Sequence, residues 1–341
     1  MRTLTSTASF VVAFDSGIPD FRSSNGLYAT LDADKLTCFD PFQRERIRQD
    51  PSYCLDQHLF LENPLPCLEV NREFILGVRD RKWKATLAHR FVEYLCSATK
   101  PSSKLCRLYT QNIDGLEDQC STLPDGKRIA VHGSMDQAEC AVCGEMYPNF
   151  DEFCRRVKTQ IKDITGQDPN APTESTPIRC PFCNAPSVKP AIVLFRSSLP
   201  KEFFRKVPDD VKDVDLLIII GTSLHVAPAN SLVWRVPKRA MRVLVNREAV
   251  GWHLGLNFDH NDRDFLGQGD CEQVCLDLIE KLGWLPKLQP LLDQNEIPAS
   301  SAKLLRDRLA EIEQREQKNA SGTAQGLQEQ SDEKSNAQEP K

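Results

Sequence analysis

The segment Asp215-Leu-Leu-Ile-Ile-Ile-Gly-Thr-Ser-Leu224 joins an unbroken apolar run to a small polar cluster. Such a run is typical of a strand in a parallel sheet that helices cover on both faces. Residues 104–109, 129–131 and 241–245 follow the same pattern. The chain is therefore predicted to form a doubly wound α/β fold. Ligands bind such sheets at the carboxyl ends of the strands, where these polar clusters fall.

Helices are predicted between the strands from the spacing of apolar residues. Residues 84–96 and 271–282 each carry one apolar face at helical spacing, and Gly283 follows the second as a C-cap. Residues 150–164 are predicted to form a further helix. Residues 165–177, rich in Pro, Thr and Asp, are expected to form a loop.

The composition limits the class of protein. The chain has 341 residues and a formal net charge of -5, without a dense Lys/Arg run, which argues against direct nucleic-acid binding. No apolar stretch approaches the roughly 20 residues needed to cross a bilayer. The 13 cysteines are odd in number, and four have metal-binding spacing. This usage indicates a reducing compartment, so a cytoplasmic or nuclear location is expected. The oligomeric state is not predicted.

Two Cys-x-x-Cys pairs, Cys140/Cys143 and Cys180/Cys183, are separated by 36 residues. Paired knuckles of this kind hold zinc tetrahedrally through four thiolates. The alternative is two pairs of buried thiols. A zinc ion with four sulfur ligands has no open position, so it stabilises the fold without taking part in chemistry. The metal-binding module, about residues 134–190, is predicted to be an insertion into the larger domain.

Several polar groups are candidates for binding and catalysis. His132 lies at a strand end, where a general base can be held near neutral pH, although a lone histidine is more often structural. Gly221-Thr222-Ser223 offers backbone N–H groups and hydroxyls to a phosphate or ribose. Asn246 ends the next strand and suits a ribose hydroxyl; an ordinary turn is the alternative.

The loop Ser16-Gly-Ile-Pro-Asp-Phe-Arg-Ser23 places an anion, an aromatic ring and a guanidinium side by side. Arginine binds phosphate well, and a ring can shield a reactive carbon from water. Asp20, Phe21 and Arg22 are therefore candidates for a ligand site. The alternative is an ordinary turn.

The order of these motifs resembles the sirtuins, a family of NAD-dependent protein lysine deacylases. The motifs that carry the resemblance are GIPDFRS (17–23), GLY (26–28), YTQNIDGLE (109–117), VHGS (131–134), the two cysteine pairs, VKPAIVLF (188–195), GTSL (221–224), VLVN (243–246), GDC (269–271) and LGW (282–284). The likeness covers about residues 16–285. It is greatest to the eukaryotic class that contains cytosolic and nuclear histone and tubulin deacetylases.

The resemblance implies a Rossmann-like NAD-binding domain, an inserted zinc module, and a site that takes NAD and acyl-lysine from opposite sides. It implies that His132 is the general base and that Asn112 and Asp114 act with it. The implied cofactor-binding residues are Asp20, Phe21, Arg22, Gln111, Asn112, Asp114, Gly221, Thr222, Ser223, Asn246 and Cys271. The implied substrate-binding residues are Ile192, Val193, Leu194 and Phe195.

The reaction implied is NAD-dependent deacetylation of protein lysine, with histone- or tubulin-like substrates, which releases nicotinamide and O-acetyl-ADP-ribose. Two alternatives remain open. One is a catalytically impaired sirtuin-fold module that binds zinc and a peptide. The other is an enzyme that removes other acyl groups or transfers ADP-ribose.

Three departures from the family pattern motivate these alternatives. Residues 10–14 are apolar and indicate a strand, yet Ser9-Phe-Val-Val-Ala13 stands where the family has Gly-Ala-Gly-Ile-Ser. The side chains of residues 9–13 are expected to obstruct the binding of a diphosphate, and few residues precede them to form the central strand. Ala191 replaces an Asp or Asn, and Arg196-Ser197 replaces Gly-Glu beside the substrate strand.

The predicted organisation has three parts. A sirtuin-type deacetylase domain covers residues 1–287. A helical extension covers residues 288–318, where Leu304, Leu305, Leu309 and Ile312 recur at helical spacing. Residues 319–341 are rich in Gln, Glu, Ser, Asn and Ala, which predicts a disordered tail.

Overall fold

The computed structural model describes residues 8–12, 26–98, 105–123, 126–259 and 263–336. Its contacts divide the chain into two units, Met1–Trp284 and Leu285–Lys341. Within the described residues, no helix has both the length and the apolar composition needed to span a bilayer.

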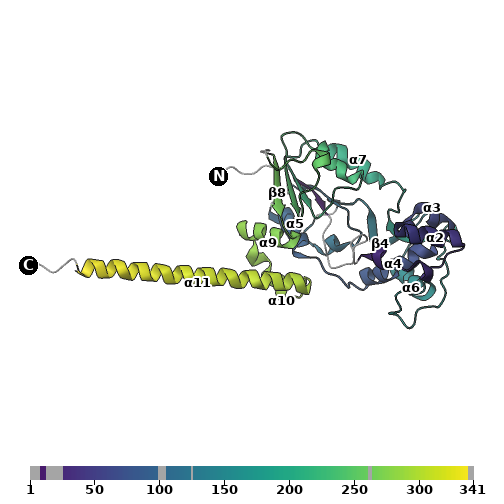
Figure 1. Cartoon of the computed structure of the whole chain (residues 1–341), viewed down its shortest axis with the longest axis horizontal. Helices are drawn as coiled ribbons and strands as arrows, with labels where there is room; N and C mark the ends of the chain where they lie inside the picture. Colours follow the sequence, from purple (N-terminus) through teal and green to yellow (C-terminus); the bar gives the residue numbers. More distant parts are fainter. Residues whose placement is uncertain (1–7, 13–25, 99–104, 124–125, 260–262, 337–341) are drawn as a thin grey trace, which may run out of the picture. The chain divides into compact units, whose positions relative to one another are not determined.

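Six parallel strands form the main sheet of the first unit, in the order β3-β2-β1-β6-β7-β8. Figure 1 shows β8, the last strand of this order. They are β1 Ala8–Val12, β2 Leu105–Thr110, β3 Arg128–Ala130, β6 Leu216–Ile220, β7 Met241–Asn246 and β8 Asp264–Gln268. The chain moves outward from β1 to β3 on one side and from β6 to β8 on the other. This is the doubly wound, Rossmann-like order, so the predicted fold class is confirmed.

The central strand corrects one prediction. Residues 9–12, which were expected to replace the glycine loop of the family, belong to β1 and pair with both β2 and β6. Phe10 lies opposite Leu108 on one side and Ile218 on the other. The run Phe-Val-Val has the aromatic and β-branched composition that a strand favours. The expected lack of a central strand is therefore wrong, and the residues that follow, 13–25, lie outside the described residues.

Helices flank this sheet: α5 Leu87–Ala98, α7 Lys201–Asp210, α8 Leu232–Arg235 and α9 Cys271–Lys281. Two of them match the helices predicted at 84–96 and 271–282. Gly283 has a φ of 71°, as its predicted C-cap position requires, because a residue without Cβ adopts this conformation without strain. Ile219 and Leu244 of the sheet share one buried cluster with Phe203 of α7 and Val233 of α8.

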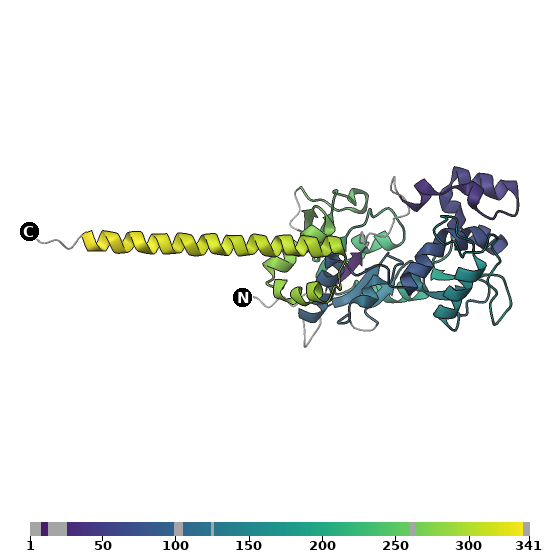
Figure 2. The ribbon, with the colours of Figure 1, turned by 90° about the horizontal axis from the view of Figure 1, so that it is seen from below.

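A smaller region is built from two separate segments. The first contains α1 Leu27–Thr30, α2 Pro41–Gln49, α3 Gln57–Glu62 and α4 Leu65–Arg79. The second contains the antiparallel strands β4 Gly133–Cys140 and β5 Val188–Ile192, with α6 Phe150–Gln160 between them. The helix predicted at 150–164 is thus present but shorter. The two ribbon views show α2, α3, α4 and α6 gathered at one end of the unit (Figure 2).

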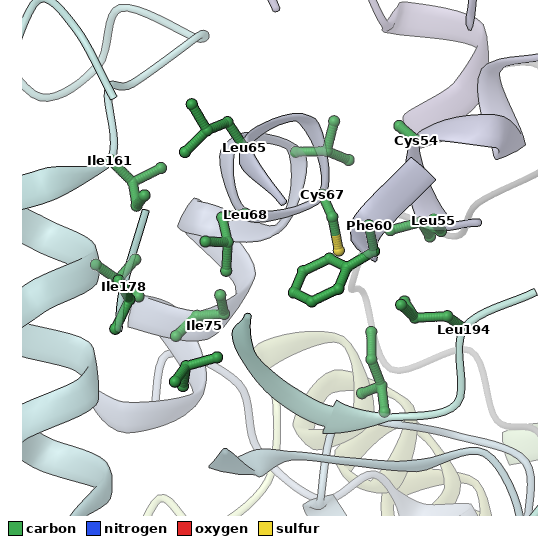
Figure 3. Packing of buried hydrophobic residues seen from close by; sticks show 14 of the residues in the cluster. Cys54, Leu55, Phe60, Leu65, Cys67, Leu68, Ile75, Ile161, Ile178 and Leu194 are labelled. Atoms are coloured by element: carbon green, nitrogen blue, oxygen red, sulfur yellow. The ribbon is translucent and has the colours of Figure 1, made fainter. Parts of the chain in front are cut away.

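The two segments share one hydrophobic core. Leu68 and Ile75 of α4 are fully buried and lie in the same cluster as Ile161 and Ile178, which follow α6 (Figure 3). Short 3-10 helices complete the first unit: η1 Ala33–Lys35, η2 Pro51–Leu55, η3 Leu116–Gln119, η4 Ala229–Ser231 and η5 Trp252–Leu254. The predicted module of residues 134–190 therefore packs on a helical segment that the sequence did not assign to it.

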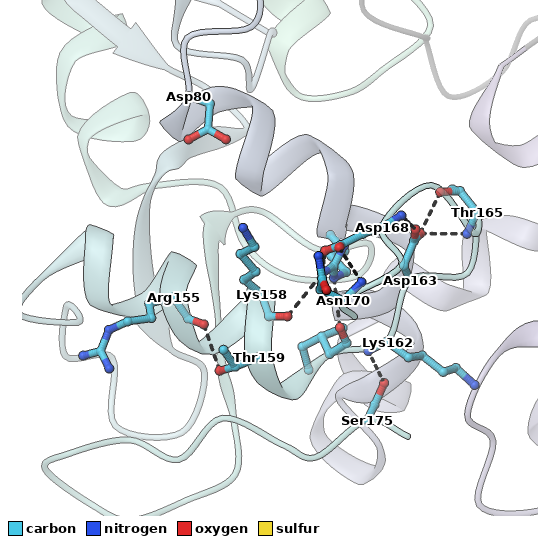
Figure 4. A network of polar contacts seen from close by, with 12 residues as sticks. Asp80, Arg155, Lys158, Thr159, Lys162, Asp163, Thr165, Asp168, Asn170 and Ser175 are labelled. Atoms are coloured by element: carbon cyan, nitrogen blue, oxygen red, sulfur yellow. Dashed lines mark hydrogen bonds and ion pairs between the residues drawn. The ribbon is translucent and has the colours of Figure 1, made fainter. Parts of the chain in front are cut away.

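Arg72 of α4 joins these segments by polar contacts. Its buried guanidinium donates to the backbone oxygens of Ile161, at 2.9 Å, and Lys158, at 3.2 Å. It also pairs with the Asp168 carboxylate at 2.7 Å. Figure 4 shows Lys158 and Asp168 within the polar network of this loop, where Asp163 accepts from the backbone of Asp168. Arg72 thus holds the loop after α6 against α4.

Arg72→Ala is expected to lower the free energy of unfolding by about 1–3 kcal/mol, because the buried Ile161 carbonyl loses its partner. Urea titration followed by circular dichroism measures this change. Arg155→Gln is the control, since Arg155 is exposed and its ion pair with Glu152 lies within α6. The control is expected to change stability by less than about 0.5 kcal/mol. Equal stability of both variants would contradict the structural role of Arg72.

The second unit contains η6 Leu285–Lys287, α10 Gln289–Asp293 and α11 Ala299–Asn336. Leu305, predicted to lie on an apolar helical face, is fully buried. α11 continues beyond residue 318, where the sequence predicted a disordered tail. Residues 319–336 lack proline, and their three Gln, two Glu, two Ala and one Lys favour helix even where no core can form. The three-part division of the chain remains a proposal.

Candidate active site

Three predicted site residues contact one another at the carboxyl ends of β2, β3 and β6. His132 follows β3, and its Nδ1 lies 3.0 Å from the backbone oxygen of Gln111, which follows β2. The Gln111 side chain donates from Nε2 to Thr222 Oγ1, at 3.2 Å, after β6. Since β1 lies between β2 and β6, this hydrogen bond joins the loops after two strands that are not neighbours in the sheet. The predicted meeting of polar strand ends is thus present.

The environment of His132 sets its protonation. A carbonyl oxygen only accepts hydrogen bonds, so Nδ1 carries the hydrogen and donates it to Gln111. Nε2 is then the basic nitrogen. Burial lowers the pKa of His132 below its usual value of 6.5, while the bond to Gln111 opposes this shift. The side chain is therefore a neutral imidazole at pH 7, with Nε2 able to accept a proton.

Gly133 holds His132 close to β5. Its φ is +77°, and a Cβ at this position would lie 2.0 Å from the backbone oxygen of Ala191. Only glycine fits such an approach. On the same side, Val193 N donates to the His132 backbone oxygen at 2.8 Å. The histidine is thus fixed between the main sheet and β5, which ends at Ile192, the first of the predicted substrate-binding residues.

The loop after β2 holds two further predicted residues. The backbone N–H of Asn112 donates to Thr110 Oγ1 at 3.2 Å. Asp114 is buried, and its Oδ1 accepts from Leu116 N at 3.0 Å, which fixes the turn.

The same loop contains Glu117, to which the sequence analysis gave no role. Its side chain is buried, and burial together with the charge of Asp114 raises the pKa of Glu117 to about 7. Contact with Thr110 and the charge of Arg128 oppose the shift. The motif places this carboxyl group three residues from Asp114, but the burial of both side chains is decided by tertiary packing, so the motif alone did not reveal it.

The Gly221-Thr222-Ser223 loop follows β6 as predicted. Gly221 has a φ of 65°, and its N–H donates to the Val245 carbonyl of β7 at 3.0 Å. Thr222 is buried, and its Oγ1 also accepts from Leu224 N at 3.2 Å. Ser223 is exposed. The loop therefore presents the Ser223 hydroxyl outward and uses the Thr222 hydroxyl internally.

Asn246 and Cys271 lie together at the end of β7. The Cys271 thiol donates to the Val245 carbonyl at 3.7 Å, the same oxygen that Gly221 contacts. The Asn246 side chain donates to the Glu248 carbonyl at 2.9 Å, and its backbone oxygen accepts from Gly269 N at 3.0 Å. These contacts join the ends of β6, β7 and β8 to the start of α9. Asp20, Phe21 and Arg22 lie outside the described residues.

The predicted substrate-binding segment divides into two kinds of residue. Ile192 and Leu194 are buried in the core of the smaller region, whereas Val193 is half-buried and Phe195 is 38% exposed. This alternation follows from the period of two in an extended chain. The accessible side-chain surface of this segment therefore belongs mainly to Val193 and Phe195.

The four predicted metal ligands form one cluster. The sulfur atoms of Cys140, Cys143, Cys180 and Cys183 all lie within 4.8 Å of one another. Cys140 Sγ lies 3.6 Å from Cys183 Sγ, and Cys143 Sγ lies 3.7 Å from Cys180 Sγ. Four thiolates at zinc–sulfur distances of ~2.3 Å have edges of ~3.8 Å, so the cluster fits a closed structural zinc site. These distances exclude disulfides, whose sulfur atoms lie about 2 Å apart.

Residues 11–228 match the family model described as Sir2 family. The chain belongs to the Sir2 family. Three similar proteins support this assignment. NAD-dependent deacetylase sir2C of Dictyostelium discoideum is 34% identical over 290 residues, which are 83% of this chain and 57% of the relative. NAD-dependent protein deacetylase hst2 of Schizosaccharomyces pombe is 32% identical over 279 residues, 82% of this chain and 71% of the relative.

The third relative is NAD-dependent protein deacetylase sirtuin-3 of Mus musculus, 31% identical over 284 residues, which cover 83% of this chain and 72% of the relative. For sir2C, the matched chain spans little more than half the length of the relative. The sirtuin resemblance of the motifs is thus confirmed as Sir2-family membership. No comparison favours the alternative of an impaired member of the Sir2 family. That alternative rested on the absence of a Gly-Ala-Gly segment at residues 9–13, of which residues 9–12 belong to strand β1.

Proposed function

We propose that the chain is an NAD-dependent protein lysine deacetylase that releases nicotinamide and O-acetyl-ADP-ribose. The observation that carries this proposal is the hydrogen-bonded series His132, Gln111 and Thr222 at the carboxyl ends of three neighbouring strands. This series places the neutral imidazole of His132 beside polar side chains that can bind a nucleotide. The relatives are named as NAD-dependent deacetylases, which supports the same activity.

The residues at these strand ends fit NAD by their chemistry. Gly221 is hydrogen-bonded to β7 and has no Cβ, so a phosphate could approach its backbone closely. Gln111, Asn112 and Asp114 would hold the nicotinamide and its ribose, and Ser223, Asn246 and Cys271 the phosphate and adenosine half. When bound, NAD supplies the ribose carbon that becomes reactive as nicotinamide leaves.

His132 would act as the general base. Its Nε2 would accept the proton of a ribose hydroxyl of bound NAD, which would favour transfer of the acetyl carbon from the lysine nitrogen to that oxygen, with the lysine amine as the leaving group. The Gln111 carbonyl holds the imidazole in the required tautomer and stabilises the imidazolium that forms. The acetyl-lysine would lie along residues 192–195, in which Val193 N donates a hydrogen bond to the backbone oxygen of His132.

We propose acetylated proteins as partners, with histone- or tubulin-like proteins as the substrates to test first. A cytoplasmic or nuclear location is proposed from the cysteines, because none of the eleven that the structure describes in full forms a disulfide. The net charge of -5 supports recognition of a peptide over direct contact with nucleic acid.

The test is incubation of the purified chain with NAD and an acetyl-lysine peptide, followed by mass spectrometry of peptide and nicotinamide. Deacetylated peptide and nicotinamide in equal amounts support the proposal. Parallel reactions with succinyl- and fatty-acyl-lysine peptides identify a different acyl preference. Transfer of ADP-ribose to the peptide, or NAD binding by calorimetry without any product, would contradict the proposed activity.

The pH dependence of the reaction tests the role of His132. The base acts when unprotonated, and burial lowers its pKa below 6.5. Deacetylation at saturating NAD and peptide is therefore expected to fall as the pH drops through a value below 6.5, with no loss between pH 7 and 8. Initial rates from pH 5 to 9, with stability checked at each pH, provide the measurement. A base with a pKa of 7.5 or higher would contradict the assignment.

A further inference from the structure

The backbone turns sharply after Phe195, and the residue at the turn is unusual. Arg196 has a φ of +67°, which a residue with a Cβ rarely adopts. Such a conformation persists where surrounding contacts hold it. The contacts at this turn come from the helical segment of the smaller region, far away in the sequence.

Asp56 is the main contact of Arg196. The Arg196 guanidinium donates from Nε to Asp56 Oδ2 and forms an ion pair with it through Nη2. The Asp56 side chain is 5% exposed, whereas that of Arg196 is 49% exposed. Asp56 is also the N-cap of α3, where its Oδ1 accepts from His58 N at 2.9 Å. A buried carboxylate thus fixes both a helix end and the guanidinium.

The backbone reinforces this contact. Phe195 N donates to the Leu55 oxygen at 2.9 Å, and Gln57 N donates to the Phe195 oxygen at 3.1 Å. These bonds form a parallel bridge between Asp56 and Phe195. Two residues earlier, Val193 N donates to the His132 oxygen. The segment is therefore held by the histidine at one end and by Asp56 at the other.

We propose that Asp56 and Arg196 are positioning residues for the acyl-lysine substrate. Their ion pair holds residues 193–195 extended, with Val193 and Phe195 presented to the peptide and the acyl group directed toward His132. An extended peptide gains affinity from a strand edge that is already in place, because the protein then loses little entropy on binding. This inference rests on the proposed function and extends it to two residues outside the cofactor site.

The test compares Asp56→Asn and Arg196→Gln with the wild type in steady-state deacetylation. Asparagine still caps α3 but carries no charge, so it removes the ion pair selectively. Each variant is expected to raise KM for the peptide about tenfold, with kcat and KM for NAD within about twofold of the wild type. Arg196→Lys is expected to recover part of the loss. Because the two residues act as a pair, the double variant is expected to lose no more than either single variant.

Arg205→Gln is the matched control, since Arg205 is an exposed arginine of α7 that pairs with Glu202 at 3.6 Å. It is expected to leave all constants unchanged. An unchanged peptide KM in both test variants overturns the inference. A parallel loss of kcat, NAD affinity and melting temperature also overturns it, because it indicates a merely structural role. Should Asp56→Asn fail to fold, Arg196→Gln carries the same test at an exposed position.

Failure of the proposed function is distinguishable from failure of this inference. If the wild type shows no turnover, fluorescence anisotropy with a labelled acetyl-lysine peptide measures binding directly. Weaker binding to both variants than to the wild type supports the positioning role without catalysis. Equal affinities, or no binding to the wild type, overturn it.

Discussion

His132→Ala is expected to lower the rate of deacetylation by about 10²–10⁴-fold, the usual contribution of a positioned general base. The effect follows from geometry: Nδ1 is committed to the Gln111 carbonyl, so Nε2 is the nitrogen that can take a ribose proton. Burial keeps the imidazole neutral at pH 7. Alanine removes the base, while the backbone bond from Val193 remains. Single-turnover assays with saturating NAD and acetyl-lysine peptide measure the loss.

His58→Ala is the control for this experiment, because His58 lies on α3 and is exposed. It is expected to retain full activity. Calorimetry should show NAD binding to His132→Ala within a few-fold of the wild type, since the proposed phosphate and adenosine contacts are intact. Deacetylation by His132→Ala at the wild-type rate would refute the proposed base.

Cys140→Ser combined with Cys143→Ser is expected to abolish zinc binding and unfold the smaller region. Structural zinc sites of four thiolates contribute on the order of 10 kcal/mol of apparent binding free energy, and two ligands cannot hold the ion. Metal analysis should fall from about one zinc per chain to near zero. Far-ultraviolet circular dichroism and a thermal melt should show partial loss of structure at 25 °C.

The zinc site is also expected to affect activity, although it takes no part in chemistry. Cys140 ends β4, whose first residue, Gly133, follows His132. β5 begins at Val188, close to Cys183 in the chain, and leads to Val193, which bonds to the His132 backbone. Loss of zinc should therefore displace the base and the substrate segment together. Cys38→Ser, a half-buried thiol outside the cluster, is the control. Full activity in the metal-free double variant would contradict this coupling.

Short-range pattern was enough to predict most of the main sheet and the cysteine cluster. The apolar run at 216–220 is typical of a strand that is covered by helices on both faces of a sheet. The Cys-x-x-Cys spacing places two thiolates in one turn, where both can bind the same metal ion. β8 was missed because Asp264–Gln268 is short and ends in polar residues. Residues 10–14 were predicted from their composition to form a strand, and residues 10–12 do so, although comparison with the family aligned residues 9–13 with its glycine segment.

The sequence by itself determined the fold class, the four thiolates and the polar residues that end the strands, because each depends on neighbours within a few positions. Only the tertiary structure decided that Gln111 joins His132 to Thr222, that Glu117 is buried beside Asp114, and that the helical segment with Asp56 holds the chain after Phe195. The contacts of Gln111 and Asp56 join residues far apart in the chain, and the burial of Glu117 depends on packing that its neighbours in sequence do not determine. Packing of the whole unit sets their distances, and a pattern of residue types along the sequence carries no such distances.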